Sequence, residues 1–597
     1  MSAIATTGGA LREAARDARR SWTPAAWSAV AVVGLAALVP FVLPGWVRVD
    51  GLAETGYLAL AAVGLGFAVG IGGMPSIVQG AFVGVGAVCA AHLVGSGWPG
   101  PLAALVGAAA AALGGIAVGM AVVRFRPVYV AAATWITTWL FALGLDAFPR
   151  LSGGSRGLVV PPEWSTTLHY ELALALVAAA MLAHRTLARS SFGLTLRASA
   201  ERPAAAAALG AEAARLRLRA FAGAAAVGGL AGGFAVQLLG VADPSSYGPW
   251  LSFQLLVAVL VGGGTTALGP TVGVLVLGGL SLVAELFGRM TGSETARFGP
   301  MLAALLLLAV LTLGGDGLVP AAARRLRWRG TRPEIATAVT PFGGGSLAAR
   351  GLGKRFGGLV ALDELELDAR PGRVVALIGP NGSGKTTALR LLAGTLDADA
   401  GEVRLDGADV TVEPTTQRVR RGLVRTIQSN AVFPHLTALE NATVGASLRR
   451  PYGGALRTLL TTPKARREAR VVRARALDAL RIVGLTERAN ELAESLTSAE
   501  QRLLMVASAL ATEPRVLLLD EPSAGAAPPD LDRLTGVLQG LTEKGLAIVV
   551  VEHNLRLVRS IAEDVVVLDA GKRLAAGAPD DIAADTAVRA AYFGRPR

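Results

Sequence analysis

Long apolar runs separated by short polar segments fill the first half of the chain. A helix needs about 20 apolar residues to cross the hydrocarbon core of a bilayer. On that scale the pattern predicts ten membrane-spanning helices, with a weak boundary between the eighth and the ninth at 262–270. The predicted spans are 25–45, 53–71, 78–97, 101–123, 128–148, 169–184, 219–240, 250–263, 268–288 and 300–319.

From residue 347 onward the sequence is typical of a water-soluble α/β protein, with apolar runs of strand length and helical stretches between them. We therefore expect a polytopic α-helical membrane domain fused to a soluble α/β domain. The expected parts are a basic N-terminal segment at 1–24, a transmembrane domain at 25–320, a basic linker at 321–346 and the soluble domain at 347–597.

Composition supports this division. The chain has 597 residues, which is too long for one domain of about 150 residues. Hydrophobic residues make up 52% and charged residues 17%, and the mean hydropathy is +0.50. The net charge of +13 comes largely from arginines that border the apolar runs, where cytoplasmic segments of membrane proteins carry them. The charge therefore reports membrane topology, and no nucleic-acid partner is expected.

A phosphate-binding loop is predicted in the soluble half. The sequence GPNGSGKTT lies between an apolar strand and a helical stretch, which is the context of a P-loop. Its glycines let backbone N–H groups wrap the phosphates, Lys385 is expected to pair with the β- and γ-phosphates, and Thr386 is expected to hold Mg²⁺. The loop residues predicted to bind ATP are Gly379, Pro380, Asn381, Gly382, Ser383, Gly384, Lys385, Thr386 and Thr387.

Other residues complete the predicted nucleotide site. One apolar strand ends in Asp520, expected to coordinate Mg²⁺, and Glu521, expected to polarise the attacking water. Another strand is followed by His553, which fits a γ-phosphate sensor. Gln428 lies where a loop would carry an amide that contacts water and Mg²⁺. Phe356 is a candidate for stacking on adenine, with core packing as the alternative. The predicted catalytic residues are thus Glu521, His553 and Gln428, and the predicted Mg²⁺ ligands are Thr386, Gln428 and Asp520.

The polar segment at 190–218 interrupts the apolar half. Because ATP is cytoplasmic, the basic N-terminus and the ATP-binding domain should both lie inside, which requires an even number of spans and places this segment inside too. It is too polar to span and rich enough in alanine for a helix, with Gly210 as a stop. A cytoplasmic helix between two spans is where a permease would receive force from an ATPase. An ordinary amphipathic connector is the alternative.

In their order along the chain, these motifs resemble those of ABC-transporter ATPases. The ordered set is Phe356, GPNGSGKTT, Gln428, LTSAEQR, LLLDEP and VEHNL. The segments FGGLVAL, RTIQSNAVFPHLTALENATVG and AAYFG resemble more specifically the ATPase subunit of high-affinity branched-chain amino acid importers. In the membrane half, GMPSIVQGAFVGVGA, LSGGSRGL, RSSFGLTLRASAERPAAAAALG and GGGTTALGPTVG resemble the permease of that system. The resemblance covers nearly the whole chain and favours a coupling helix at 190–218.

The resemblance also implies a signature loop, which in dimers of ABC ATPases caps the nucleotide held by the opposite subunit. Its residues here are Leu496, Thr497, Ser498, Ala499, Glu500 and Gln501. Ala499 stands where the family usually has glycine, and a methyl group there removes conformational freedom. Glu500 stands where glutamine is usual and is expected to bring negative charge near an anionic ligand. Ala527, after the Asp-Glu pair, replaces a usual asparagine.

The function implied by the resemblance is ATP- and Mg²⁺-dependent import of branched-chain or other nonpolar amino acids across the cytoplasmic membrane. The protein would be multi-pass, with both termini and the ATPase domain in the cytoplasm. Implied partners are a second permease subunit, a second ABC ATPase subunit, an extracellular substrate-binding protein and the lipid bilayer.

Three other functions stay open. Urea, short amides or aromatic carboxylates could be the imported substrates, because related permeases share these motifs. An exporter or lipid flippase is favoured by the fusion of permease and ATPase, and disfavoured by about ten short spans and a compact coupling loop. A membrane-anchored ATPase that regulates a partner has no specific feature in its support.

Overall fold

The computed structural model describes residues 49–291, 298–313, 315, 317–325, 343–426, 431–448, 458–459 and 462–593. The chain forms two compact units. The described residues of the first unit come from 49–70, Met74–Arg185 and Leu218–Leu326, and those of the second from Ile71–Gly73, Thr186–Arg217 and Arg327–Arg597. The polar segment that interrupts the apolar half thus groups with the C-terminal part of the chain.

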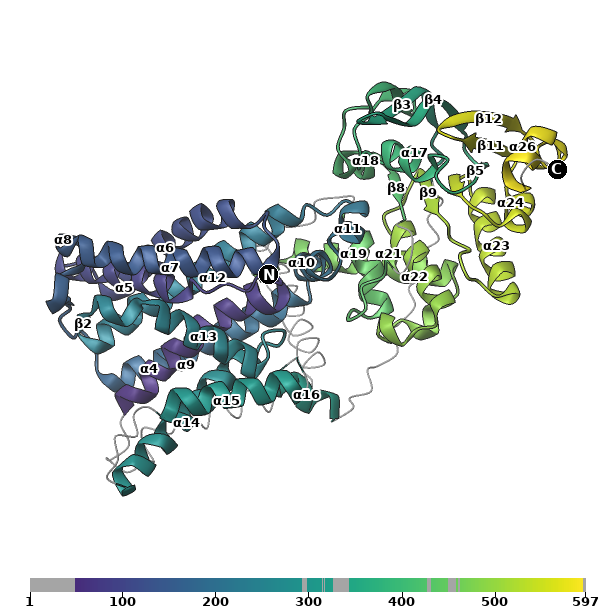
Figure 1. Ribbon diagram of the computed structural model, residues 1–597. Helices are drawn as coiled ribbons and strands as arrows, with labels where there is room; N and C mark the ends of the chain where they lie inside the picture. The colour runs from purple at the N-terminus through teal and green to yellow at the C-terminus, as the bar shows by residue number, and fades with distance from the viewer. Residues whose placement is uncertain are drawn as a thin grey trace, which may run out of the picture. The chain divides into compact units, whose positions relative to one another are not determined.

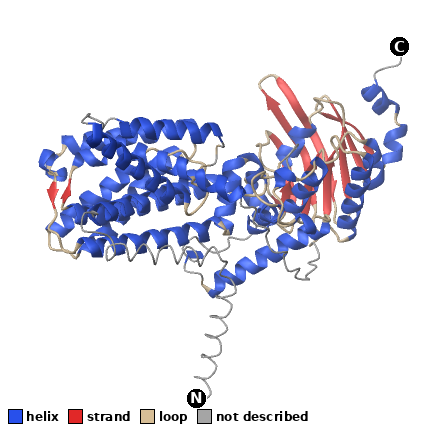
Figure 2. Cartoon of the chain, turned by 90° about the horizontal axis from the view of Figure 1, so that it is seen from below, coloured by secondary structure: helices blue, strands red, loops and turns tan. Residues whose placement is uncertain are grey.

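The first unit is helical (Figures 1 and 2). Its long helices are α4 (Val49–Gly66, continued by the π-helical turn η1, Phe67–Ile71), α5 (Gln79–Gly95), α6 (Gly100–Val122), α7 (Pro127–Ala147), α9 (Thr166–Ala188), α12 (Ala213–Leu239), α13 (Pro249–Gly262), α14 (Gly269–Thr291) and α15 (Phe298–Leu313). The shorter elements are α8 (Pro149–Ser152), η2 (Gly154–Arg156), η3 (Pro244–Tyr247), α16 (Leu318–Arg325) and the two-stranded pair β1 (Leu158–Val159) and β2 (Val241–Ala242).

Five helices among the described residues are long and apolar enough to cross a membrane. They are Val49–Ile71, α6, α7, α9 and α12, and three shorter apolar helices cover Gln79–Gly95, Pro249–Gly262 and Gly269–Val283. The predicted count of ten spans is therefore not confirmed, because several apolar runs form helices shorter than a bilayer requires. The first predicted span, 25–45, lies outside the described residues.

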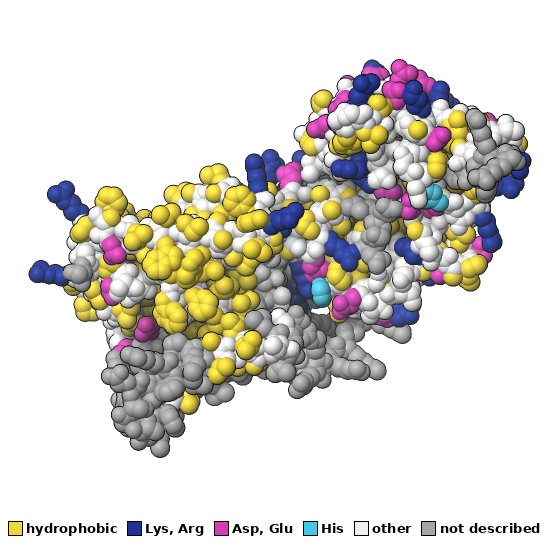
Figure 3. Space-filling model, in the orientation of Figure 1, with side chains coloured by type: hydrophobic (Ala, Val, Ile, Leu, Met, Phe, Trp, Pro, Cys, Tyr) yellow, Lys and Arg dark blue, Asp and Glu magenta, His cyan; other side chains and the backbone are white. Residues whose placement is uncertain are grey.

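Apolar side chains gather on the face of this unit that Figure 3 shows, as expected of a surface in contact with lipid. The exposed ones on α6 and α7 include Leu105, Leu113, Met120, Ile136, Trp139, Leu140 and Leu143. Inside, small residues let helices approach closely: a Cβ on Gly86 of α5 would overlap the backbone of Gly229 in α12, and one on Gly232 would overlap that of Val83. Close contact at small residues is the usual packing of membrane helices.

The second unit contains two sheets, which hold most of the strands in Figure 2. The six-stranded sheet has the order β12-β11-β5-β10-β9-β8, with β12 antiparallel and the other five parallel. Its strands are β5 (Val374–Ile378), β8 (Leu423–Arg425), β9 (Val516–Asp520), β10 (Ala547–Val551), β11 (Asp564–Asp569) and β12 (Lys572–Gly577). Strands β5, β9 and β10 are buried throughout, as continuous apolar runs in a covered parallel sheet should be.

The four-stranded antiparallel sheet has the order β4-β3-β6-β7. It consists of β3 (Leu347–Phe356), β4 (Leu359–Ala369), β6 (Ala400–Leu405) and β7 (Ala408–Asp409). The helices of the C-terminal part are α17 (Lys385–Leu392), α18 (Thr415–Arg421), α19 (Ala438–Leu448), α21 (Pro463–Ile482), α22 (Ser498–Leu510), α23 (Pro528–Glu543), α24 (Leu555–Ile561), α25 (Pro579–Ala584) and α26 (Thr586–Phe593). Two 3₁₀ turns, η5 (Thr486–Arg488) and η6 (Ala493–Ser495), precede α22.

Two helices complete the second unit, α10 (Ser191–Glu201) and α11 (Pro203–Ala208). The sequence predicted helical structure in this segment, and the structure confirms it as two helices that break at Pro203. Gly210 follows α11 in the left-handed region, with φ of 100°. A Cβ there would meet Val419 of α18 at 2.9 Å, so both the backbone conformation and the close approach require glycine.

Candidate functional site

The predicted phosphate loop joins β5 to α17. Gly379, Gly382 and Gly384 have φ values of 150°, 83° and 101°, a region that other residues seldom adopt. A Cβ on Gly379 would overlap the carbonyl of Leu568 at the end of β11. The loop therefore curls tightly over the carboxyl edge of the sheet, and its last residue is the N-cap of α17. The N-terminus of that helix favours negative charge.

Lys385 lies across this loop rather than in solvent. Its side chain is buried, and Nζ donates to the carbonyl oxygens of Gly379 and Pro380, both at 2.8 Å. Burial lowers the pKa of Lys385, and the negative charges of Glu521 and Asp520 oppose that shift. The ammonium is thus held inside the loop, where the sequence predicted its contact with phosphate.

Asp520 and Glu521 end the neighbouring strand β9. Asp520 is buried, and its Oδ2 accepts a hydrogen bond from Nη2 of Arg425 at 2.7 Å. Glu521 leaves the strand with φ of 48°, an uncommon conformation for a residue with a side chain. Its N–H donates to Val551 at 2.9 Å, which fixes this turn against β10.

His553 follows β10 and reaches the same edge. Its Nε2 lies 3.0 Å from Oε1 of Glu521, so the structure brings together two residues that are 32 positions apart. Glu552, buried beside it, accepts hydrogen bonds from the N–H of Ser523 at 2.7 Å, from its hydroxyl at 2.8 Å, and from the N–H of His553 at 3.1 Å. Glu552 had no role predicted from the sequence. Its signal was a carboxylate directly after a buried strand.

The donor set at this edge suits Mg²⁺. The hydroxyl of Ser383 and Oδ1 of Asp520 are buried and have no hydrogen-bond partner among the described residues. Oxygen donors of this kind, completed by phosphate and water, are what Mg²⁺ prefers. In the described ranges no cluster of three His, Cys, Asp or Glu side chains could hold a metal ion alone. Thr386 is exposed in the first turn of α17, and Gln428 lies outside the described residues.

Phe356 ends β3 and is 46% exposed. The ammonium of Lys354 lies 5.8 Å from the ring centroid. A side chain this exposed contributes little to the core, so the core alternative for Phe356 is weakened. Its stacking on adenine stays a prediction.

The predicted signature loop forms the start of α22. Thr497 is the N-cap and Glu500 closes a capping box: the Thr497 hydroxyl accepts from the Glu500 N–H at 3.2 Å, and Oε2 of Glu500 accepts from the Thr497 N–H at 2.9 Å. Arg488 lies 3.6 Å from the other carboxylate oxygen. The backbone hydrogen bond from Thr497 is the largest of the interactions that lower the pKa of Glu500. The carboxylate of Glu500 thus interacts with Thr497 and Arg488 of its own chain.

A cavity of about 230 Å³ lies between the signature helix and the two acids. Its lining residues are Ala431, Ser498, Gln501, Arg502, Met505, Asp520, Glu521 and Ala524. Gln501 closes one side by donating from Nε2 to the carbonyls of Ala493 and Leu496 at 3.0 and 3.1 Å. The start of α22 and the carboxyl edge of the sheet therefore border one space.

The segment at 190–218 packs against the helices of the C-terminal part. Leu194, Ala198, Ala206 and Leu209 belong to the same buried apolar cluster as Val419, Phe433 and Leu439. Polar contacts flank this apolar centre: the hydroxyls of Thr195 and Ser447 lie 3.3 Å apart, and Arg420 donates to Glu212 at 2.9 Å.

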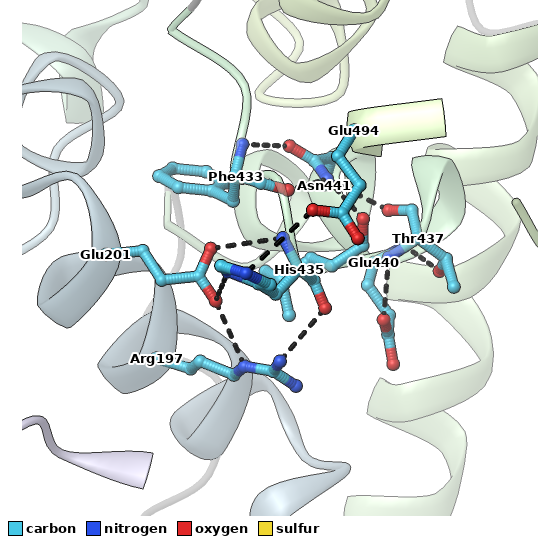
Figure 4. Close-up of polar contacts among 9 residues, drawn as sticks. Arg197, Glu201, Phe433, His435, Thr437, Glu440, Asn441 and Glu494 are labelled. Carbon is cyan, nitrogen blue, oxygen red and sulfur yellow. Dashed lines mark hydrogen bonds and ion pairs between the residues drawn. The ribbon is translucent and has the colours of Figure 1, made fainter. Parts of the chain in front are cut away.

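The loop before α19 contacts helix α10 (Figure 4). Asn441, fully buried, accepts from the N–H of Phe433 at 2.8 Å and donates to its carbonyl at 3.0 Å, which fixes the loop before α19. Arg197 then donates from Nη2 to the carbonyl of His435 at 3.0 Å, and the N–H of His435 donates to Glu201 at 3.4 Å. The interface between this segment and the C-terminal helices thus combines apolar packing with paired polar contacts.

Comparison with known proteins agrees with both halves of the molecule. Residues 47–311 match the family model of the branched-chain amino acid transport system permease component, and residues 362–524 match that of the ABC transporter. The high-affinity branched-chain amino acid transport ATP-binding protein BraF of Pseudomonas aeruginosa is 39% identical over 249 residues, which are 42% of this chain and 97% of that protein. The corresponding protein LivG of Escherichia coli is 36% identical over the same shares of the two chains.

The chain belongs to the branched-chain amino acid ABC transporter family. It joins a permease-type region to an ABC ATPase domain, and ATP hydrolysis by that domain is coupled to transport. The lipopolysaccharide export system ATP-binding protein LptB of Haemophilus influenzae is also similar, at 29% identity over 42% of this chain and 97% of that protein. Among solved structures, a nucleotide-free ATP-binding cassette from an ABC transporter matches with 28% identity and a TM-score of 0.37, covering 42% of this chain and all of that one.

Proposed function

We propose that this ABC transporter chain imports branched-chain or other nonpolar amino acids across the cytoplasmic membrane. The observation that carries this proposal is the match of residues 47–311 to the permease component of branched-chain amino acid transport. The relatives of the ATPase half, named as branched-chain amino acid transport proteins, support the same class of substrate. Both halves of one chain thus favour one transport system.

In this proposal Lys385 binds the β- and γ-phosphates, and Thr386 and Asp520 hold Mg²⁺ with Gln428. Magnesium supplies charge neutralisation at the transferred phosphoryl group. Glu521 orients the attacking water, and His553, 3.0 Å away, holds that carboxylate and senses the γ-phosphate. The remaining loop residues, with the start of α17, present N–H groups to the anion. Phe356 stacks on adenine, and the start of α22 faces a nucleotide held by a partner ATPase.

The segment that contains α10 and α11 is proposed to carry conformational change from the ATPase to the permease. A contact that transmits force must involve a rigid surface. The loop that is held by Asn441 and that binds Arg197 and Glu201 provides such a surface. Movement of that loop would displace α10, which is connected along the chain to α9 on one side and, through α11, to α12 on the other.

The proposed assembly contains a second permease subunit, a second ABC ATPase subunit and an extracellular substrate-binding protein. The chain is placed as a multi-pass protein of the cytoplasmic membrane with both termini inside. The arginines bordering the apolar helices support this orientation.

Urea, short amides and aromatic carboxylates remain the alternative substrates. Export is less well supported: an export ATPase is among the relatives, but that similarity concerns the ATPase half alone. In this proposal the assignment of import rests on the match of the permease half.

The deciding experiment reconstitutes the complete complex in liposomes with its binding protein. Radiolabelled leucine, isoleucine, valine, urea, acetamide and benzoate are then tested for ATP-dependent uptake. The expected result is uptake of the branched-chain amino acids, with the amides and benzoate at background. Uptake of urea or a carboxylate alone would replace the proposed substrate, and ATP-dependent efflux would reverse the direction.

A further inference from the structure

The buried carboxylate Asp520 has one strong partner in the nucleotide site. Oδ2 of Asp520 accepts from Nη2 of Arg425 at 2.7 Å, and the two side chains are only 1% and 9% exposed. A buried charge is unfavourable unless an opposite charge and hydrogen bonds compensate it. Arg425 provides both for Asp520 among the described residues.

The sheet register explains why these two residues meet. Strands β8 and β9 run parallel, with Arg425 opposite Leu518, so both strands end at the same edge. Nη1 of Arg425 also lies 3.5 Å from the hydroxyl of Thr395, just beyond α17. The guanidinium therefore lies between the acid strand and the segment that follows the P-loop helix.

The ion pair with Arg425 uses only one of the two carboxylate oxygens of Asp520. Oδ1 is buried without a hydrogen-bond partner in the described part of the chain, and the same holds for the hydroxyl of Ser383 in the P-loop. An unsatisfied buried oxygen costs free energy unless something else binds it. Mg²⁺ or a water in its coordination shell would satisfy both oxygens.

We propose that Arg425 is a positioning residue for magnesium, which holds the Asp520 carboxylate in one orientation through Oδ2 and leaves Oδ1 for the metal. This inference rests on the proposed role of Asp520 and adds a residue that acts through it. Because a guanidinium has only hydrogen-bond donors, it cannot bind the metal itself and acts through the carboxylate. Without it the carboxylate would turn, or lose its compensated charge, and Mg²⁺ would bind less well.

The test compares nucleotide binding with and without metal, using the full-length protein in its assembled complex. Affinity for a fluorescent ATP analogue is measured in EDTA and again in millimolar Mg²⁺, and the ratio gives the Mg²⁺ effect. Arg425→Met should leave the affinity in EDTA within twofold of wild type and reduce the Mg²⁺ effect at least tenfold. The matched control is Arg421→Met, which removes an exposed arginine paired with Glu413 and should change neither value.

A second variant covers the case in which Arg425→Met does not fold. Arg425→Lys keeps the buried positive charge but cannot place a donor where Nη2 stands, so it should fold and lose at least threefold of the Mg²⁺ effect. Asp520→Asn should reduce the Mg²⁺ effect while leaving the affinity in EDTA unchanged. The double variant Asp520→Asn/Arg425→Met should show no smaller Mg²⁺ effect than Asp520→Asn. The affinity for Mn²⁺, measured by EPR on the nucleotide-bound protein, should fall in the Arg425 variants together with the Mg²⁺ effect.

Three results would overturn the proposal: a wild-type Mg²⁺ effect in the arginine variants, an equal loss of affinity in EDTA and in Mg²⁺, or a further loss from Arg425→Met in the Asp520→Asn background. The second result would make Arg425 a purely structural residue. None of these measurements depends on the transported substrate. If the proposed import failed while the Mg²⁺ effect behaved as expected, the positioning role of Arg425 would stand.

Discussion

At the scale of single residues, the nucleotide site depends on charged side chains that come from the ends of neighbouring strands. The parallel register of β9 and β10 brings Asp520, Glu521 and His553 to the same edge of the sheet. Arg425 and Glu552 lie in the segments RTIQSNAVFPHLTALENATVG and VEHNL, but neither residue had a role predicted from the sequence. Their partners lie 95 and 29 positions away, and such distant pairings follow from strand order, which periodicity does not reveal.

Substitution of the two central charges tests the nucleotide site. Lys385→Ala should weaken ATP binding strongly, because it removes the buried ammonium that is proposed to pair with phosphate. Glu521→Gln should retain ATP and slow hydrolysis by about 10²–10⁴-fold, since an amide cannot accept the proton of the attacking water. Equilibrium binding and single-turnover hydrolysis of the purified complex measure the two effects separately. Wild-type hydrolysis by Glu521→Gln would remove Glu521 from the mechanism.

The capping box at Thr497 predicts how the signature loop responds to mutation. Glu500→Gln should leave the unfolding temperature nearly unchanged, because glutamine closes the same box, whereas Glu500→Ala should lower stability by about 1 kcal/mol. The pKa of Glu500 is lowered in the folded protein, so its contribution is present above its unfolded pKa and is lost as pH falls through the folded value. Thermal melts from pH 7 to pH 3 should therefore show less pH dependence in Glu500→Gln. Equal stability of all three proteins would contradict the cap.

At the scale of elements, the sequence pattern predicted an element well where one apolar run forms one strand, as in β5, β9 and β10. The span count was not confirmed, because the length of an apolar run does not show how many of its residues form a helix: the run at 78–97 contains α5, with 17 residues, and the run at 250–263 largely coincides with α13, with 14. The helix at 190–218 was predicted as one element, yet its burial against α18 and α19 depends on residues more than 200 positions away. A single sequence shows an Ala-rich polar stretch and cannot show which surface covers it.

A disulfide can test whether α10 binds α19 of the same chain. The hydroxyls of Thr195 and Ser447 lie 3.3 Å apart, close enough for cysteines at both positions to oxidise. In a Cys89→Ala background, Thr195→Cys/Ser447→Cys should form an intrachain bond, seen as a faster monomer band on a non-reducing gel, and transport should stop until reductant is added. The single-cysteine variants are the controls. A dimer band in place of the monomer would mean that the segment binds the ATPase of another copy.

At the scale of the whole molecule, one chain supplies one permease-type region and one ATPase domain. The sandwich of ATP between two ATPase domains, implied by the family resemblance, needs a second signature loop from a partner. A homodimer would present Ala499 to both nucleotides, whereas a partner with the usual glycine would give one site without that methyl group. Since Glu500 is engaged by Thr497 and Arg488, the methyl of Ala499 is the departure that matters most.

We therefore predict an asymmetric complex in which the site built on this chain's P-loop performs most of the turnover. Ala499→Gly should change ATPase activity by less than about threefold, which is about 0.7 kcal/mol in the activation free energy, because it alters only the minor site. Lys385→Ala should abolish turnover, because it disables the major site. Steady-state ATPase assays on the complex, with both variants made in the same preparation, measure the contrast. A many-fold rise in turnover on Ala499→Gly would show that the site capped by this chain limits the rate, and transport by this chain as a homodimer would contradict the asymmetry outright.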